Sequence, residues 1–259
     1  MPFVWVALSL PILWFLQRWI HRHLHGVAFL LSGNKNWAVV LYAIILFPGV
    51  LLHEVSHWLT ATLLGVRTGS FSVLPRTKSD GSVQLGYVEY YKTSSVGPIR
   101  ESLIGSAPLV VGTAVILLIG LFVFDVTTLA ASVEAGDLDL LTQAISEFFA
   151  TGDFLLWLYL IFAISNAMMP SASDRRAWPA FALILIAFAV LLYVLRLQTL
   201  FFSGVVGPAS TVFGYLGLAF SLTIGVDLFF MLAIHLLEWL VSRLKGVDLV
   251  YGNSDTPPG

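Results

Sequence analysis

Long apolar runs separated by short polar segments dominate the sequence. A helix needs about 20 apolar residues to cross roughly 30 Å of hydrocarbon, and six runs approach that length. They cover 2–20, 36–66, 99–124, 154–169, 177–197 and a stretch within 210–244. The pattern predicts an all-α polytopic membrane protein with about six transmembrane helices. The apolar stretch 199–209 before the last run is a candidate re-entrant or interfacial piece.

One polar connection differs from the others in its periodicity. Residues 67–98 join the second and third runs, and within them 70–73 and 83–87 alternate with a period of about two, which is typical of strands. Between them lies 79–82, Ser-Asp-Gly-Ser, a strong turn signal. We therefore expect a small β-hairpin on the cytoplasmic side, with a plain connecting loop as the alternative.

The distribution of basic residues predicts the orientation, because cytoplasmic connections carry an excess of Lys and Arg. The connection 126–153 has neither residue and holds five acidic ones, whereas the connections on both sides of it carry several basic residues. We expect it to be an outward-facing acidic loop, which puts both termini in the cytoplasm. The expected location is the plasma membrane, with the lipid bilayer as a partner.

Composition supports this fold and excludes other classes. Hydrophobic residues make up 58% of the 259 positions and charged residues 11%, whereas soluble domains are about 25% charged. The net charge of −2 leaves no basic excess for a nucleic-acid backbone, so no nucleic-acid partner is expected. Because the chain has no cysteine, any metal site must use His, Asp or Glu.

An ionisable motif, His53-Glu54-Val55-Ser56-His57, interrupts the second apolar run. Ionisable groups inside a membrane span are functional candidates by default. Since an α-helix has 3.6 residues per turn, the two histidines lie one above the other and can bind one metal ion, with Glu54 beside it to hold a water. This spacing is typical of zinc hydrolases. The alternative is that neighbouring helices merely satisfy these polar side chains.

A catalytic zinc ion usually has three protein ligands and one water, so a third ligand must come from elsewhere. Asp174 is the best candidate, because Pro170 and the serines after it end the fourth run and let a carboxylate turn back into the bundle. The predicted orientation puts both halves of the site at compatible depth. The alternative is a solvated turn carboxylate that pairs with Arg175 or Arg176.

The remaining ionisable groups are weaker candidates. Three histidines alternate over 21–25 at the end of the first run, which is typical of an interfacial cluster. Asp227 lies within the last run, where we expect either a function or a buried pair with Arg196. His235 and Glu238 share a helix face near the end of that run.

The motif at 53–57 and the stretch from Asn166 to Asp174 two runs later resemble the site-2 protease family of intramembrane zinc metalloproteases. The resemblance covers the second to fourth runs. It implies an endopeptidase that cuts single-span membrane proteins in or near their transmembrane segments. In that family two histidines and an aspartate bind zinc, a glutamate is the acid/base and an asparagine holds the substrate strand, which here implies His53, His57, Asp174, Glu54 and Asn166.

The sequence also departs from that family. Arg175 follows the aspartate where glycine is usual, the proline pattern is shifted to Pro170, and the third run reads Gly-Ser-Ala-Pro over 105–108 without the family's following asparagine. No PDZ-like insertion fits, so the chain resembles the compact members. We expect one intramembrane metalloprotease domain over the whole chain. Its parts are a catalytic core of about 36–176, accessory helices 1–35 and 177–244, and a disordered tail 245–259.

Other functions stay open at this point. The chain is alternatively a metal transporter, a metal-dependent membrane sensor, or a catalytically degenerate family member that binds membrane segments. A zinc protease that trims prenylated proteins also carries this motif, and Glu238 is the only plausible third ligand for that type. For a protease, a helical substrate must unwind before attack. Strand addition along 69–74 or 83–91 would then present it to the metal.

Overall fold

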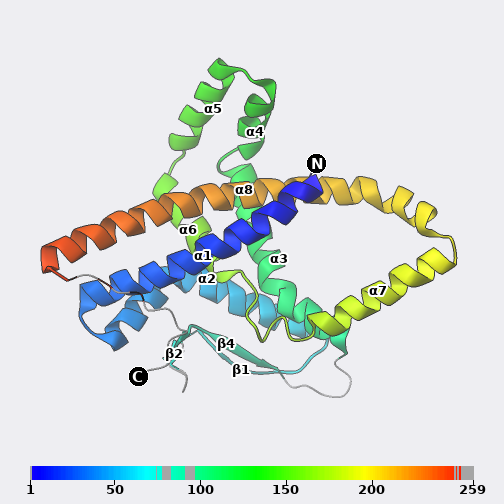
Figure 1. Ribbon diagram of the computed structural model, residues 1–259, viewed down its shortest axis with the longest axis horizontal. Coiled ribbons are helices and arrows are strands. Elements are labelled where there is room, and N and C mark those ends of the chain that lie inside the picture. The colour runs from blue at the N-terminus through cyan, green and yellow to red at the C-terminus, as the bar shows by residue number, and fades with distance from the viewer. Residues whose placement is uncertain are drawn as a thin grey trace.

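A computed structural model of the chain describes residues 2–73, 75–77, 83–90, 97–247, 249 and 251. These residues form eight α-helices and four short strands (Figure 1). Four helices are long and apolar enough to cross a membrane. They are α1 (Pro2–Ser32), α2 (Lys35–Leu63), α3 (Pro98–Phe122) and α8 (Gln198–Lys245). The helices α5 (Leu138–Phe149) and α6 (Phe154–Ala167) meet at 87° and together pass the same test, which makes up to five.

The chain is thus an all-α protein with the helices of a membrane protein, as the apolar runs predicted. The run at 177–197 forms α7 (Trp178–Val194), which is shorter than the four long helices, and none of its residues is buried. Apart from the contact of α7 with α3, α7 and the first part of α8 extend away from the remaining helices (Figure 1). The packed core of the protein therefore lies among α1, α2, α3, α6 and the second half of α8.

The core is a continuous apolar cluster to which these five helices contribute. Its fully buried members include Ile20, Leu46, Ile116 and Ile161. Two helices approach very closely at Gly49 of α2, where an added Cβ would lie 1.8 Å from the Ala163 carbonyl oxygen of α6. Small residues let membrane helices pack backbone against backbone in this way. This contact fixes the C-terminal end of α6 beside the motif of α2.

The polar connection after α2 contains paired strands, as its periodicity predicted. Strand β1 (Thr68–Ser72) pairs antiparallel with β4 (Tyr87–Tyr90), and β2 (Arg76–Thr77) pairs with β3 (Val83–Gln84). The predicted turn at 79–82 lies outside the described residues. The strands lie against α2 at one end of the bundle (Figure 1).

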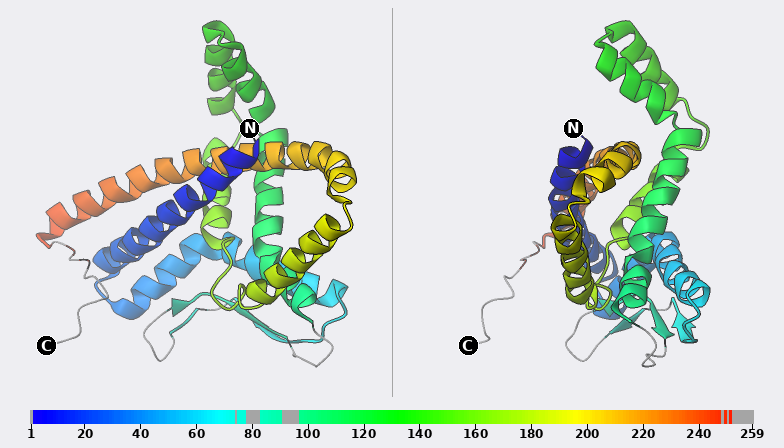
Figure 2. Two further views of the ribbon diagram at one scale, coloured as in Figure 1. Left: turned by 45° about the vertical axis from the view of Figure 1, so that its right-hand side comes forward. Right: turned by 90° about the vertical axis from the view of Figure 1, so that its right-hand side faces the viewer.

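The acidic connection 126–153 is a helical hairpin rather than a loop. It contains α4 (Val126–Ala135) and α5, and it projects from the end of the bundle opposite the strands (Figure 2). Gly136, with φ of 66°, ends α4, and the Asp137 side chain caps α5 by accepting from two backbone N–H groups. Short helices like these have no long apolar run, so hydropathy alone does not predict them.

The last long helix is also different from the expectation. Residues 199–209 do not form a separate re-entrant piece, because α8 continues from Gln198 through Pro208 to Lys245. A proline inside a helix removes a single backbone hydrogen bond, and here the flanking turns keep the helix intact. Beyond α8, Leu249 and Tyr251 pack against Gly26 of α1, within the tail that we expected to be disordered.

Candidate metal centre

The two histidines of the α2 motif face each other one helical turn apart. His53 Nε2 lies 3.1 Å from His57 Nε2. Each ring has its other nitrogen bound to a backbone carbonyl: His53 Nδ1 donates to Ala167 at 2.6 Å, and His57 Nδ1 donates to Ile104 at 2.9 Å. A carbonyl can only accept, so both protons lie on Nδ1. Both Nε2 atoms therefore present lone pairs to the same point, which is the arrangement of metal-ligating imidazoles.

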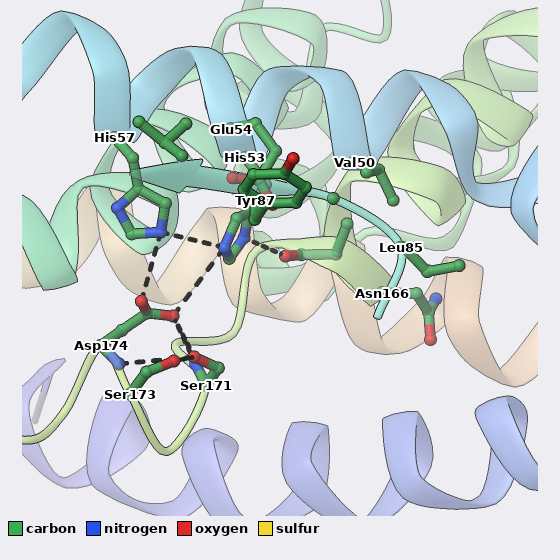
Figure 3. A pocket seen from close by; sticks show the side chains of 13 residues that line it. Val50, His53, Glu54, His57, Leu85, Tyr87, Asn166, Ser171, Ser173 and Asp174 are labelled. Atoms are coloured by element: carbon green, nitrogen blue, oxygen red, sulfur yellow. Dashed lines mark hydrogen bonds and ion pairs between the residues drawn. The ribbon is translucent and has the colours of Figure 1, made fainter. Parts of the chain in front are cut away.

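The structure brings Asp174 to that point. Its Oδ1 lies 3.4 Å from His57 Nε2 and its Oδ2 lies 3.9 Å from His53 Nε2 (Figure 3). One ligand atom from each of the three residues lies within 4.8 Å of the others. Ser171 holds the carboxylate by donating to Oδ2 from its backbone N at 2.7 Å and from its hydroxyl at 2.6 Å. Within the described ranges, no other three His, Asp or Glu side chains converge in this way.

The third helix positions both sides of this centre, through a role that sequence reasoning missed. Gly105 has no room for a side chain, because an added Cβ would lie 2.0 Å from the Asp174 carbonyl oxygen. Pro108 lies four residues after Ile104 and has no N–H to donate to the Ile104 carbonyl. That carbonyl is therefore free to accept from His57. A proline four residues after the acceptor was the available signal in the sequence.

Glu54 shares a cavity of about 340 Å³ with the three metal-binding candidates. The carboxylate is buried, with 6% of the residue exposed. Gly86, between β3 and β4, lies directly against this carboxylate, because an added Cβ would lie 2.8 Å from Glu54 Oε1. Leu85 and Tyr87 line the same cavity (Figure 3). A carboxylate and three potential ligands thus meet in one cavity that admits water.

Asn166 also lines this cavity. Its amide nitrogen donates to the Phe162 carbonyl at 2.9 Å, to Ser165 Oγ at 3.2 Å and to Asp227 Oδ1 at 3.0 Å. The predicted pair of Asp227 with Arg196 is wrong. Arg196 lies next to the start of α8. Because α8 is continuous, Asp227 lies roughly 40 Å further along this helix, too far away to pair with Arg196.

The other ionisable candidates are not part of the cluster at this centre. His21 Nδ1 pairs with the Tyr42 hydroxyl at 2.5 Å, and His23 Nδ1 lies 2.6 Å from Glu238 Oε2. Glu238 also accepts from the Tyr251 hydroxyl, so it is not a third ligand for the motif of α2. His235 lines a separate cavity with His23 and Glu238. Of the three histidines of α1, His21 and His25 both lie against Tyr42 and His23 pairs with Glu238, and they form no cluster of metal-binding groups among the described residues.

The donor set of the centre fits a divalent cation. Two neutral imidazole nitrogens and a carboxylate repel one another unless a positive charge lies among them, and these are ligand types that zinc uses in hydrolases. Comparisons with protein-family models, curated proteins and solved structures find no match for the chain. Its function is therefore inferred from the geometry of this centre and from the motif.

Proposed function

We propose that the chain is an intramembrane zinc endopeptidase of the site-2 protease type. It would hydrolyse peptide bonds in or near the transmembrane segments of single-span membrane proteins. One observation carries this proposal: two Nε2 lone pairs and the Asp174 carboxylate converge beside Glu54 in one cavity. The helices that supply them are suited to a membrane, where such a polar cluster is expensive without a function.

His53, His57 and Asp174 would hold the zinc ion. Zinc with three protein ligands and an open position polarises a carbonyl and makes water acidic enough to attack near neutral pH. Glu54 takes the proton of the attacking water and gives it to the departing amine, so that one water is consumed for each peptide bond broken. The buried position of this carboxylate keeps the proton transfer away from bulk solvent.

The strands beside the cavity offer a way to hold the substrate. Tyr87 and Val88 of β4 line the cavity, and among the described residues β4 pairs with β1 in the sheet. A substrate strand would add along the side of β4 that faces the cavity. An unwound substrate segment has free backbone groups that need partners, and strand addition supplies them. The cavity favours the stretch 83–91 over 69–74, although Leu74 and Tyr91 lie outside the described residues.

The expected orientation puts the α4–α5 hairpin outside and the strands and both termini on the cytoplasmic side of the plasma membrane. The start of α1, however, lies near the base of the hairpin (Figure 2), so we propose this orientation for the hairpin and the strands and not for the N-terminus. The hairpin and the strands lie at opposite ends of the bundle, which this orientation requires (Figure 2). The hairpin has no Lys or Arg, as outward-facing segments prefer. Six crossings would include α7 as a short one. Cleavage would then release a cytoplasmic fragment.

The test uses the purified full chain with model single-span substrates. Wild type should cleave them, a chelator should stop cleavage and added zinc should restore it. Glu54→Gln should abolish cleavage while keeping bound metal, and Glu147→Gln, on an exposed face of α5, is the matched control that should cleave normally. Cleavage that survives both the chelator and Glu54→Gln, or a wild type that cleaves nothing, would reject the proposal. Metal uptake into vesicles that tolerates Glu54→Gln would instead identify a transporter.

A further inference from the structure

The last turn of α6 is held by three other helices. The final carbonyls of a helix have no partner within it and must find one elsewhere. Gln17 of α1 donates to the Ser165 carbonyl, and His53 of α2 donates to the Ala167 carbonyl. Between these two carbonyls, the side chains of Ser165 and Asn166 turn toward Asp227 of α8. This turn therefore connects the metal centre to the opposite side of the bundle.

Asp227 is the most unusual member of this group. It is completely buried in an apolar helix, where a carboxyl group is costly unless hydrogen bonds satisfy it. Its Oδ1 accepts from Ser165 Oγ at 2.8 Å and from Asn166 Nδ2 at 3.0 Å, and its Oδ2 is buried without a hydrogen-bond partner. Both of its hydrogen bonds thus go to the last turn of α6. The proposed mechanism makes no use of this residue.

We propose that Asp227 is a positioning residue for the metal centre. The Asp227 carboxylate fixes the side chains of Ser165 and Asn166, and these two residues hold Ala167 in place. The Ala167 carbonyl then orients the His53 ring so that its Nε2 atom faces His57 and Asp174. Partners that orient a ligand from outside the coordination sphere typically change metal affinity by about 10- to 100-fold. The inference rests on the proposed function only in requiring that the centre binds a metal, and it does not require proteolysis.

A purely structural role for Asp227 makes a different prediction. If the carboxyl group only joins α8 to α6, its removal lowers the unfolding temperature and leaves the affinity and spectrum of the bound metal unchanged. If it positions His53, the metal ligand field changes as well. Cobalt separates the two roles, because the visible absorption of Co²⁺ reports the geometry of its ligands directly.

The experiment titrates the metal-depleted full chain with Co²⁺ and records visible absorption, affinity and unfolding temperature. Asp227→Leu should weaken Co²⁺ binding about 10- to 100-fold and alter the spectrum. Asp227→Asn, which can still accept from Ser165 and Asn166, should restore both. The matched control is Thr223→Val, because Thr223 is equally buried one turn earlier on α8 and bonds only to its own helix at Ala219. It should leave affinity and spectrum unchanged.

A second variant keeps the inference falsifiable if Asp227→Leu does not fold. Gln17→Leu removes the other anchor of the same turn and should weaken Co²⁺ binding in the same direction, by less than Asp227→Leu. Wild-type affinity and spectrum in Asp227→Leu, or in Gln17→Leu where the first variant does not fold, would overturn the positioning role. A wild type that binds Co²⁺, shows the expected variant pattern and cleaves no substrate would reject the protease alone. A wild type that binds no Co²⁺ would overturn both.

Discussion

Two groups of histidines lie in the same bundle and do different things. On α2 the spacing of four residues puts His53 and His57 about 40° apart around the helix, and their Nε2 atoms meet at 3.1 Å. On α1 the spacing of two puts His21 and His23 about 200° apart, so they reach Tyr42 of α2 and Glu238 of α8, respectively. His21 and His25 also lie four residues apart and both rings lie against Tyr42, yet within the described residues no Asp or Glu joins them in a cluster. The difference teaches that spacing alone does not make a metal site, because a third ligand such as Asp174 must converge on the pair.

The two groups also differ in what binds the Nδ1 atoms. On α2 both Nδ1 atoms donate to backbone carbonyls, which fixes both rings and leaves Nε2 free to bind a metal. On α1 the Nδ1 atoms of His21 and His23 pair with side chains, a hydroxyl and a carboxylate. A rigid backbone acceptor allows little movement of the ring. The α2 pair is therefore preorganised, whereas the α1 histidines serve packing between helices.

The largest effect should follow from removing one histidine of each group. His57→Ala takes away one of three ligands, so zinc affinity should fall more than 100-fold, and substrate cleavage should disappear with it. His23→Ala, the control on α1, should keep the full zinc content. Elemental analysis of the purified variants measures both. Full zinc content in His57→Ala would contradict the assignment, as would loss of zinc in His23→Ala.

The next effect concerns the glycine that admits Asp174. Gly105→Ala places a methyl group 2.0 Å from the Asp174 carbonyl oxygen. Because this oxygen is a backbone atom, the segment that carries Asp174 must move to make room. We expect zinc affinity to fall about 10- to 100-fold in a competition titration with a chromophoric chelator. Gly204→Ala on α8, where no atom lies within 4 Å, is the control and should bind zinc as wild type does. Equal affinities in the two variants would show that Asp174 is not held by α3.

A smaller effect should come from the proline that frees the Ile104 carbonyl. Pro108→Ala restores an N–H that competes with His57 for this acceptor. Zinc affinity should fall by about 10-fold or less, since the His57 ring becomes less fixed but keeps its place. Pro208→Ala, also inside a membrane helix, is the control and should have wild-type affinity. The same titration serves both variants, and an affinity for Pro108→Ala above that of wild type would contradict this role.

Much of the centre could be predicted from the sequence because it is local. The spacing of His53 and His57 fixes their faces, and Pro170 predicted the turn that returns Asp174 to the bundle. The Ala167 carbonyl could not be predicted, because a backbone acceptor leaves no residue-type signature, whereas Pro108 was an indirect signal for the Ile104 carbonyl. The partner of Asp227 depends on how α8 lies against α6, and its pairing with Arg196 was inferred from charge alone.

The fold shows the same division between local and long-range information. The apolar runs predicted most ends of the long helices to within a few residues, because a membrane span has one dominant signal, its long apolar run. The helices α4 and α5 were missed because each is short and its signal is a cap and a glycine stop rather than hydropathy. The unbroken course of α8 past Pro208 was missed because the effect of a proline depends on the packing and hydrogen bonding around it.

The smallest effect is expected in the α1 region, at a glycine that resembles Gly105 in its crowding. A Cβ at Gly26 would lie 2.2 Å from the Tyr251 hydroxyl, but that atom is the tip of a flexible side chain, which can swing away. Burial, followed by the hydrogen bond to Glu238, raises the pKa of Tyr251, so the phenol stays protonated and donates at neutral pH.

Gly26→Ala should therefore lose this one hydrogen bond between Tyr251 and Glu238, worth about 1 kcal/mol. The unfolding temperature should fall by a few degrees, or less where alanine strengthens the helix. Zinc affinity should not change, because the contacts of Tyr251 involve none of the three proposed zinc ligands. A shift in zinc affinity would mean that the two histidine groups are coupled through α1. The α1 histidines would then affect the metal centre as well as the packing between helices.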